Sequence, residues 1–248
     1  MSNYDYSSGK KRIEEILNSP NETERSDRIP SQSQFSFDNG FYGYVTSVFV
    51  DIRDSTSLFA ESSNKKTTIA KVIRSFTSEV IEILRDDENL REIGVRGDCV
   101  YAIYTSPGYK NDYEIFDKVA YINTFSSMLN DILKKRQFPT IAFGIGVASS
   151  NDLVVKAGRA GVGINGLVWI GKAVSYASHL SNLANKEGNS PILISEEFYD
   201  NLLKAMEKDN PYGINQAWFS DFFSEGIRGK GCSVIKTAMS EWIENGMK

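Results

Sequence analysis

Cysteine and long apolar runs are both scarce in this chain of 248 residues. The two cysteines, Cys99 and Cys232, are too few for a disulfide framework and lack the spacing of a zinc site, which predicts a reducing compartment. No stretch reaches the roughly 18 apolar residues of a membrane span, and the N-terminus has no apolar core of the signal-peptide type. We therefore expect a cytoplasmic protein that has no membrane partner.

The chain has no excess of positive charge. It contains 28 Lys and Arg residues and 32 Asp and Glu residues, which gives a net charge of -4. Binding along a phosphate backbone requires a basic surface, so nucleic acid is not expected as a partner. A local basic pocket for a small anionic ligand stays open. The apolar content of 41% is enough for one globular domain with a substantial core.

Residues 1–40 differ in composition from the rest of the chain, being polar and interrupted by Pro20 and Pro30. Such a composition predicts a flexible N-terminal arm. The alternative is a short helix near residues 11–17 that docks on a partner subunit. From residue 41 to residue 248 the chain is interpreted as one domain.

The periodicity of apolar residues after residue 40 predicts an alternation of strands and helices. Strands are expected at 41–51, 93–96, 99–104, 140–148, 153–157, 167–170 and 191–195, with a last strand running into Thr237. Helices are expected at 56–84, 112–136, 171–183 and 196–207. The order strand, helix, hairpin, helix, strand predicts an α+β fold of the ferredoxin-like or palm type, with a central antiparallel sheet and flanking helices.

Two aspartates stand where predicted strands end. Asp51 closes an apolar run, and Asp98 lies in a Gly-Asp turn between two β-rich segments. Two carboxylates aimed at one point repel each other unless a cation lies between them, and Mg²⁺ and Mn²⁺ prefer oxygen ligands. The pair therefore indicates a divalent metal site. The plainer interpretation is that both are ordinary strand-end and turn residues.

Four segments resemble the motifs of class III nucleotide cyclases. Residues 49–56, FVDIRDST, resemble the first metal motif, and Gly97-Asp98 resembles the second. Residues 169–179, WIGKAVSYASH, are similar to the segment with the ribose-binding Asn and the transition-state Arg. Residues 228–231, RGKG, resemble the segment that contributes a triphosphate-binding cation. The four occur in the family's order across residues 41–240.

The resemblance implies cyclisation of a nucleoside triphosphate by a head-to-tail homodimer with two sites at its interface. Asp51 and Asp98 of one chain, with the carbonyl of Ile52, would hold two divalent cations per site, Mn²⁺ or Mg²⁺. The turn that ends at Thr56 would offer main-chain N–H groups to phosphate oxygens.

The remaining residues of each site would come from the partner chain. Arg228 would bind the triphosphate, with Lys230 as a second cation for the same group. Ser175 stands in the position of the ribose-binding Asn and His179 in that of the transition-state Arg. His179 is either a working substitute, since a protonated imidazole donates to phosphate, or a sign of a decayed site. Arg159 or Lys172 are alternative sources of the missing positive charge.

The positions that read the base depart from those of purine cyclases. The base-reading Lys is replaced by Gly94, and the polar residue that reads the purine edge is replaced by Val168, which forms no side-chain hydrogen bond. Arg96 lies two residues after Gly94 and so on the same face of the strand. A guanidinium only donates, which suits the two carbonyl oxygens of uracil better than cytosine with its amino group. Phe49 shares the face of Asp51 and would narrow the pocket to one ring, unless it is ordinary core packing.

These departures make the chain resemble the pyrimidine cyclases of bacterial anti-phage systems, whose cyclic product activates a separate effector. UTP is expected as substrate, ahead of CTP. Two alternatives stay open, namely a purine cyclase with unusual base contacts and a degenerate cyclase-homology module that binds nucleotide or only dimerises. Retention of both metal aspartates favours activity, because a decayed site has no reason to keep two mutually repelling carboxylates.

Overall fold

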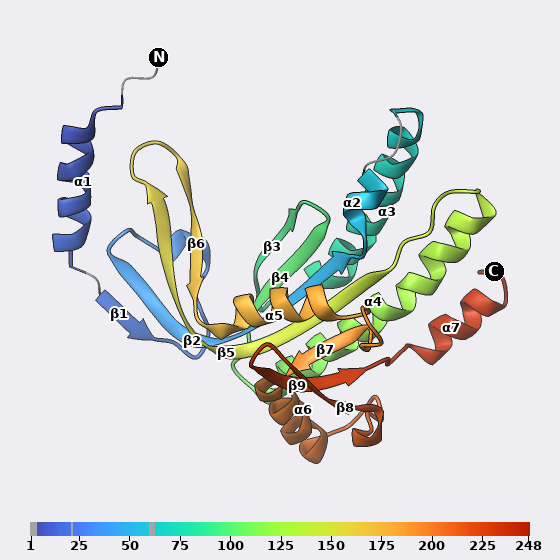
Figure 1. The fold of residues 1–248 in the computed structure, drawn as a ribbon. Coiled ribbons are helices and arrows are strands. Elements are labelled where there is room, and N and C mark those ends of the chain that lie inside the picture. The colour runs from blue at the N-terminus through green and yellow to red at the C-terminus, as the bar shows by residue number, and fades with distance from the viewer. Residues whose placement is uncertain (1–3, 21, 60–62) are drawn as a thin grey trace.

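A computed structural model describes residues 4–20, 22–59 and 63–248 of the chain. Its centre is a nine-stranded sheet with the order β3-β4-β2-β5-β7-β9-β8, to which β1 adds beside β2 and β6 beside β5 (Figure 1). The predicted α+β fold is confirmed. The sheet is mixed and not wholly antiparallel, because β1 pairs with β2, and β7 with β5, in parallel. In the described part of the chain no helix is long and apolar enough to cross a membrane.

The elements have the following bounds. The strands are β1 (Glu22–Arg25), β2 (Asn39–Ile52), β3 (Leu90–Arg96), β4 (Cys99–Thr105), β5 (Phe143–Arg159), β6 (Ile164–Ile170), β7 (Ile192–Ser195), β8 (Ser220–Ser224) and β9 (Ile227–Cys232). The α-helices are α1 (Tyr6–Asn18), α2 (Ser55–Phe59), α3 (Ser63–Arg85), α4 (Tyr109–Lys135), α5 (Lys172–Leu183), α6 (Glu196–Lys208) and α7 (Thr237–Glu244).

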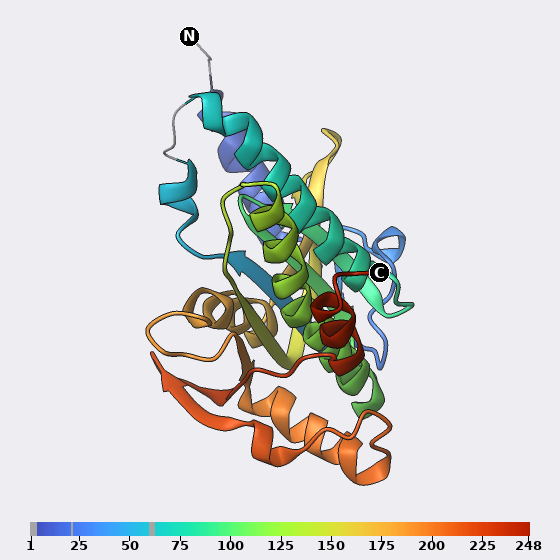
Figure 2. The same cartoon turned by 90° about the vertical axis from the view of Figure 1, so that its right-hand side faces the viewer.

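The central strand β2 has two faces because its side chains alternate. Val48, Val50 and Ile52 point into the main core, where α3, α4 and α6 cover the sheet. Figure 2 shows α3 and α4 lying side by side on this face. Phe49 packs on the opposite face, against α5. Asp51 follows two residues later and therefore also points to the α5 face.

Helix α5 lies directly on β5 because two glycines of that strand face it. A side-chain carbon at Gly146 would come within 2.1 Å of the Ala177 carbonyl oxygen, and one at Gly144 within 2.5 Å of the Ala184 carbonyl oxygen. Both contacts are with main-chain atoms of the helix or its C-terminal cap, which cannot rotate away. Only glycine at these two positions allows the helix and the sheet to come so close.

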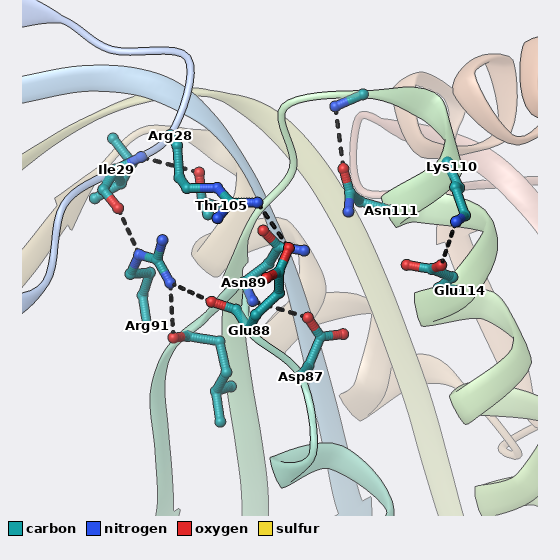
Figure 3. Close-up of polar contacts among 12 residues, drawn as sticks. Arg28, Ile29, Asp87, Glu88, Asn89, Arg91, Thr105, Lys110, Asn111 and Glu114 are labelled. Atoms are coloured by element: carbon teal, nitrogen blue, oxygen red, sulfur yellow. Dashed lines mark hydrogen bonds and ion pairs between the residues drawn. The ribbon is translucent and has the colours of Figure 1, made fainter.

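The segment predicted to be a flexible arm, residues 1–40, is built into the domain over part of its length. Strand β1 pairs with β2, and Ile29 is fully buried. The Ile29 N–H donates to Thr105 Oγ1 at 3.0 Å, and Arg91 Nε donates to the Ile29 carbonyl at 2.5 Å (Figure 3). Composition does not predict these contacts, because only a few residues of an otherwise polar segment attach it to the sheet. Residues 1–3 and 21 lie outside the described residues.

Three further predictions of elements need correction. The strands predicted at 140–148 and 153–157 form one strand, β5. The last strand does not run into Thr237, because β9 ends at Cys232 and Thr237 begins α7. The helix predicted at 56–84 is present as α2 and α3, and residues 60–62 between them lie outside the described part.

Candidate active site

Two rows of residues cross the sheet on the face that α5 covers. The residues of each row are register partners on adjacent strands, so each row runs across the sheet from strand to strand. The first row consists of Gly94 on β3, Tyr101 on β4, Phe49 on β2 and Gly146 on β5. The second consists of Arg96, Cys99, Asp51 and Gly144 on the same four strands. The glycine at the end of each row admits α5, which brings helix side chains beside the acidic and aromatic groups.

A cavity of about 400 Å³ lies between these rows and α5. Five of the sequence-predicted site residues line it, namely Phe49, Asp51, Arg96, Ser175 and His179. All five belong to a single chain here. Contributions from a partner chain stay a prediction.

Asp51 is held by the neighbouring residue Arg53, whose side chain is buried. Arg53 Nη2 donates to Asp51 Oδ2 at 2.5 Å and to the Asp51 carbonyl at 2.9 Å, while Nη1 donates to the Asn182 carbonyl at 2.5 Å. Arg53 thus ties the end of β2 to α5. Burial raises the pKa of the Asp51 carboxyl, the Arg53 guanidinium opposes that rise, and the charge of Asp98 adds to it.

Asp98 comes close to Asp51 through the predicted hairpin. Residues 97 and 98 join Arg96 to its pairing partner Cys99, and Gly97 has a φ of +65° while Asp98 does not have a positive φ. A glycine with positive φ in the first position is the pattern of a type II′ turn, whose twist suits a two-residue hairpin. The turn therefore sets Asp98 beside the end of β2.

The donor set fits a hard divalent cation. Asp51 is partly buried, a second carboxylate acts on it electrostatically, and a guanidinium now supplies its counter-charge. Carboxylate oxygens in such an arrangement are the ligands that Mg²⁺ and Mn²⁺ take. Within the described residues no group of three or more His, Cys, Asp or Glu side chains could hold a metal. Main-chain and substrate oxygens would have to complete the coordination.

His179 and Ser175 lie one turn apart on α5. His179 Nε2 lies 2.9 Å from a carboxylate oxygen of Glu225, in the turn between β8 and β9, without the alignment of a hydrogen bond. Ser175 Oγ donates weakly to the carbonyls of Gly171 and Lys172, each at 3.3 Å. Both residues line the cavity, and the imidazole of His179 lies beside the Glu225 carboxylate.

Seven predicted residues do not line this cavity. Ile52, Gly94 and Asp98 belong to the strands and the turn that carry Asp51 and Arg96, and the other four lie elsewhere. Val168 lies on the face of β6 opposite to Leu167 and Trp169, which pack toward the α5 side, and is 43% exposed. Thr56 is exposed in α2.

Arg228 and Lys230 alternate with Ile227, whose side chain packs with α5, and so face the other side of β9. There the Lys230 ammonium pairs with Asp221 and lies 5.1 Å from the centre of the Tyr199 ring. The predicted triphosphate roles of these two cations are not met within one chain.

Sequence reasoning missed three residues beside the cavity, Glu92, Tyr101 and Cys99. The signal was present, because the Gly-Asp turn fixes the pairing of β3 with β4 and so sets Tyr101 opposite Gly94. Burial, with the nearby Asp51 carboxylate, raises the pKa of the Cys99 thiol to about 12. That thiol is therefore protonated and unreactive at neutral pH.

Comparisons with known proteins agree with the fold. No protein-family model matches the chain. The crystal structure of the adenylyl cyclase CyaB from P. aeruginosa has the same fold, with a TM-score of 0.60 at 17% identity over 78% of this chain and 95% of that one. A protein named uridylate cyclase from Treponema porcinum is 46% identical over 247 residues, covering 98% of this chain and 82% of the relative. The chain belongs to the class III nucleotide cyclases.

A second relative of this cyclase, the uridylate cyclase of Gulbenkiania mobilis, is 32% identical over 228 residues, covering 90% of this chain and 87% of that one. A class III adenylyl cyclase-like ATP-binding protein from Pseudomonas aeruginosa has a TM-score of 0.67 at 17% identity, covering 95% of this chain and 48% of that one. The family resemblance predicted from the four motifs is confirmed. The protein is a nucleotide cyclase, and cyclases of this class depend on divalent cations.

Proposed function

We propose that this cyclase converts UTP into 3′,5′-cyclic UMP and pyrophosphate. The observation that carries the proposal is the cavity in which Asp51 lies with Phe49 and Arg96, beside Gly94, which offers no side chain to a purine. The two relatives named uridylate cyclase support the same substrate.

Arg96 is the group we assign to the base. Its guanidinium carries only donors, and uracil presents two carbonyl oxygens, whereas cytosine presents one carbonyl and one amino group. Adenine offers no carbonyl at all. Arg96 lies in the row of Asp51, and Phe49 lies in the next row, so a single ring could meet both while its triphosphate reaches the carboxylates. This favours UTP over CTP.

In the proposed reaction the ribose 3′-oxygen attacks the α-phosphorus, the bond from that phosphorus to the bridging oxygen breaks, and pyrophosphate leaves with the electron pair. Asp51, Asp98 and the Ile52 carbonyl would hold two divalent cations, Mg²⁺ or Mn²⁺, which acidify the 3′-hydroxyl and neutralise the leaving group. The proton of the ribose 3′-hydroxyl passes to solvent. Arg53 keeps Asp51 in place through three hydrogen bonds, one to its carboxylate and two to its main-chain carbonyl.

Helix α5 supplies two further side-chain donors, Ser175 and His179. We assign Ser175 to the ribose and His179 to the phosphate, where an imidazolium would stabilise the charge that develops on the α-phosphoryl oxygens. Lys172 begins the same helix, and its N–H is already used by Ser150 and Asp152. Its ammonium group lies 5.8 Å from the centre of the Tyr176 ring and is the alternative source of positive charge in this proposal.

A head-to-tail homodimer belongs to the same proposal. Val168 and Arg228 are exposed and do not line the cavity of their own chain, as expected of residues that act on a partner's site. Lys230 would have to leave Asp221 for the same purpose. Resemblance to the pyrimidine cyclases of anti-phage systems supports a second-messenger role for the product, read by a separate effector.

The test is to incubate the purified protein separately with ATP, GTP, CTP and UTP in the presence of Mn²⁺ and to identify the products by chromatography and mass spectrometry. Cyclic UMP as the main product is expected. Conversion of ATP or GTP alone would support a purine cyclase and contradict the proposal. No product from any of the four nucleotides would support a degenerate module.

A further inference from the structure

Tyr101 occupies the space above Gly94. The two residues are paired across β3 and β4, and Tyr101 also pairs with Phe49 on β2. A side-chain carbon at Gly94 would lie 2.8 Å from the Tyr101 hydroxyl oxygen and 2.9 Å from the ring carbon that bears it. These distances are too short for real contacts. A long side chain at position 94 and the present orientation of Tyr101 therefore exclude each other.

The orientation of Tyr101 is fixed by polar groups from two other strands. Its hydroxyl donates to Glu92 Oε1 at 2.7 Å, and Trp169 Nε1 donates to Glu92 Oε2 at 2.8 Å. One carboxylate thus joins β3, β4 and β6. Hydrogen bonds to a charged acceptor are stronger than neutral ones, so the two hydrogen bonds that join Tyr101, Glu92 and Trp169, here called the Glu92 clamp, restrict rotation of the Tyr101 ring.

The ring of Tyr101 supports Phe49 from behind. The two rings stack with their centroids 5.4 Å apart and an angle of 18° between their planes. Phe49 lines the cavity, whereas Tyr101 does not. Burial and the Glu92 hydrogen bond raise the pKa of Tyr101 to about 12, so its hydroxyl remains a donor at neutral pH. A residue that only filled the core would need neither the hydroxyl nor a partly buried carboxylate to receive it.

We propose that Tyr101, oriented by Glu92 and Trp169, is a positioning residue that determines base specificity by closing the base end of the cavity to a second ring. It acts through Phe49 and by taking up the space over Gly94. The inference rests on the proposed function, because it names how the same site admits a pyrimidine triphosphate and rejects a purine triphosphate.

The test compares kcat and KM for UTP and for ATP in the wild type, Tyr101→Phe and Tyr101→Ala. Removing the ring opens room for a purine, so Tyr101→Ala should raise the ratio of kcat/KM for ATP to that for UTP by about tenfold or more. The change should appear mainly in KM. Tyr101→Phe keeps the ring and loses its hydrogen bond to Glu92, so a smaller rise in the same ATP to UTP ratio is expected.

Phe125→Leu is the matched control, since Phe125 is fully buried on the other side of the sheet in α4. It should lower stability without changing the ATP to UTP ratio. Should Tyr101→Ala fail to fold, Glu92→Gln provides the second variant, because an amide has one acceptor oxygen for two donors. Binding of 3′-deoxy-UTP and 3′-deoxy-ATP, measured by calorimetry, should move in the same direction as the kinetics.

The outcomes separate the two proposals. An unchanged ratio in Tyr101→Ala, or in Glu92→Gln where the former does not fold, overturns the inference while cyclic UMP synthesis by the wild type upholds the proposed function. A ratio that shifts equally in Phe125→Leu also overturns the inference, because it would reflect lost stability. A wild type that makes no cyclic UMP overturns the proposed function itself.

Discussion

The contact between α5 and β5 at Gly146 makes the most quantitative prediction about the site. An alanine there would set its Cβ 2.1 Å from the Ala177 carbonyl oxygen and 2.2 Å from the Ser181 nitrogen, both atoms of the helix backbone. An ordinary contact begins at 3.4 Å, so the helix would have to retreat by about 1.3 Å. Neither atom can rotate out of the way.

The cost of Gly146→Ala follows from what that retreat disturbs. Overpacking of a tight core lowers the free energy of unfolding by about 1–3 kcal/mol. Here the retreat of the helix would separate Ala177 and Leu180, which are fully buried, from the sheet. The same movement carries His179 away from Asp51. A misplacement of about 1 Å at a reacting centre costs on the order of 100-fold in rate. We therefore expect a loss of both stability and UTP turnover.

The assay pairs urea unfolding with initial rates of UTP cyclisation, and Gly166→Ala is the matched control. An added carbon at Gly166 in β6 meets nothing within 4 Å, and the backbone there has no positive φ. Gly166→Ala should match the wild type in both measurements. If Gly146→Ala is as stable and as active as Gly166→Ala, the close docking of α5 is wrong.

Two further predictions concern a buried acid and the proposed metal ligand Asp98. Burial, opposed by donors from Thr46 and Asn201, raises the pKa of Asp112 to about 6 from 3.8. The folded state then binds this proton more tightly, so the stabilisation is complete below about pH 4 and is lost as the pH rises through 6, a fall of about 3 kcal/mol at most. Urea unfolding from pH 4 to 7 should lack that fall in Asp112→Asn, and equal pH dependence would refute the assignment. Asp98→Ala should abolish turnover and leave the oligomeric state in size-exclusion chromatography unchanged; UTP turnover at the parental rate would contradict the metal role.

The approach of Asp51 to Asp98, the two aspartates predicted to bind metal, was anticipated in part from short-range rules. Period-two alternation and a Gly-Asp turn define the pairing of β3 with β4, and β2 lies beside them. Arg96 could be assigned to the face of Gly94 for the same reason. The face of each side chain and the hairpin depend only on near neighbours, whereas the pairing of β2 with β4 joins residues 45–51 to the distant segment 99–105.

The features that were not predicted depend on contacts between distant segments. Polar residues near Asp152 indicated a break between two strands, but they lie within β5 and cap α5, since Ser150 Oγ and Asp152 Oδ1 accept from the Lys172 N–H. The glycines of β5 gave no sign that a helix would rest on them. Likewise the role of Ile29 depends on Thr105, which is 76 residues further along the chain.

The most direct test of the central claim is a competition in which the enzyme receives equal concentrations of UTP, CTP, ATP and GTP with Mn²⁺, and the cyclic products are quantified together by mass spectrometry. Cyclic UMP should dominate in the wild type, and its share should fall in Arg96→Ala as the other products gain. A purine cyclic nucleotide as the main product of the wild type would contradict the account, as would an unaltered product ratio in Arg96→Ala.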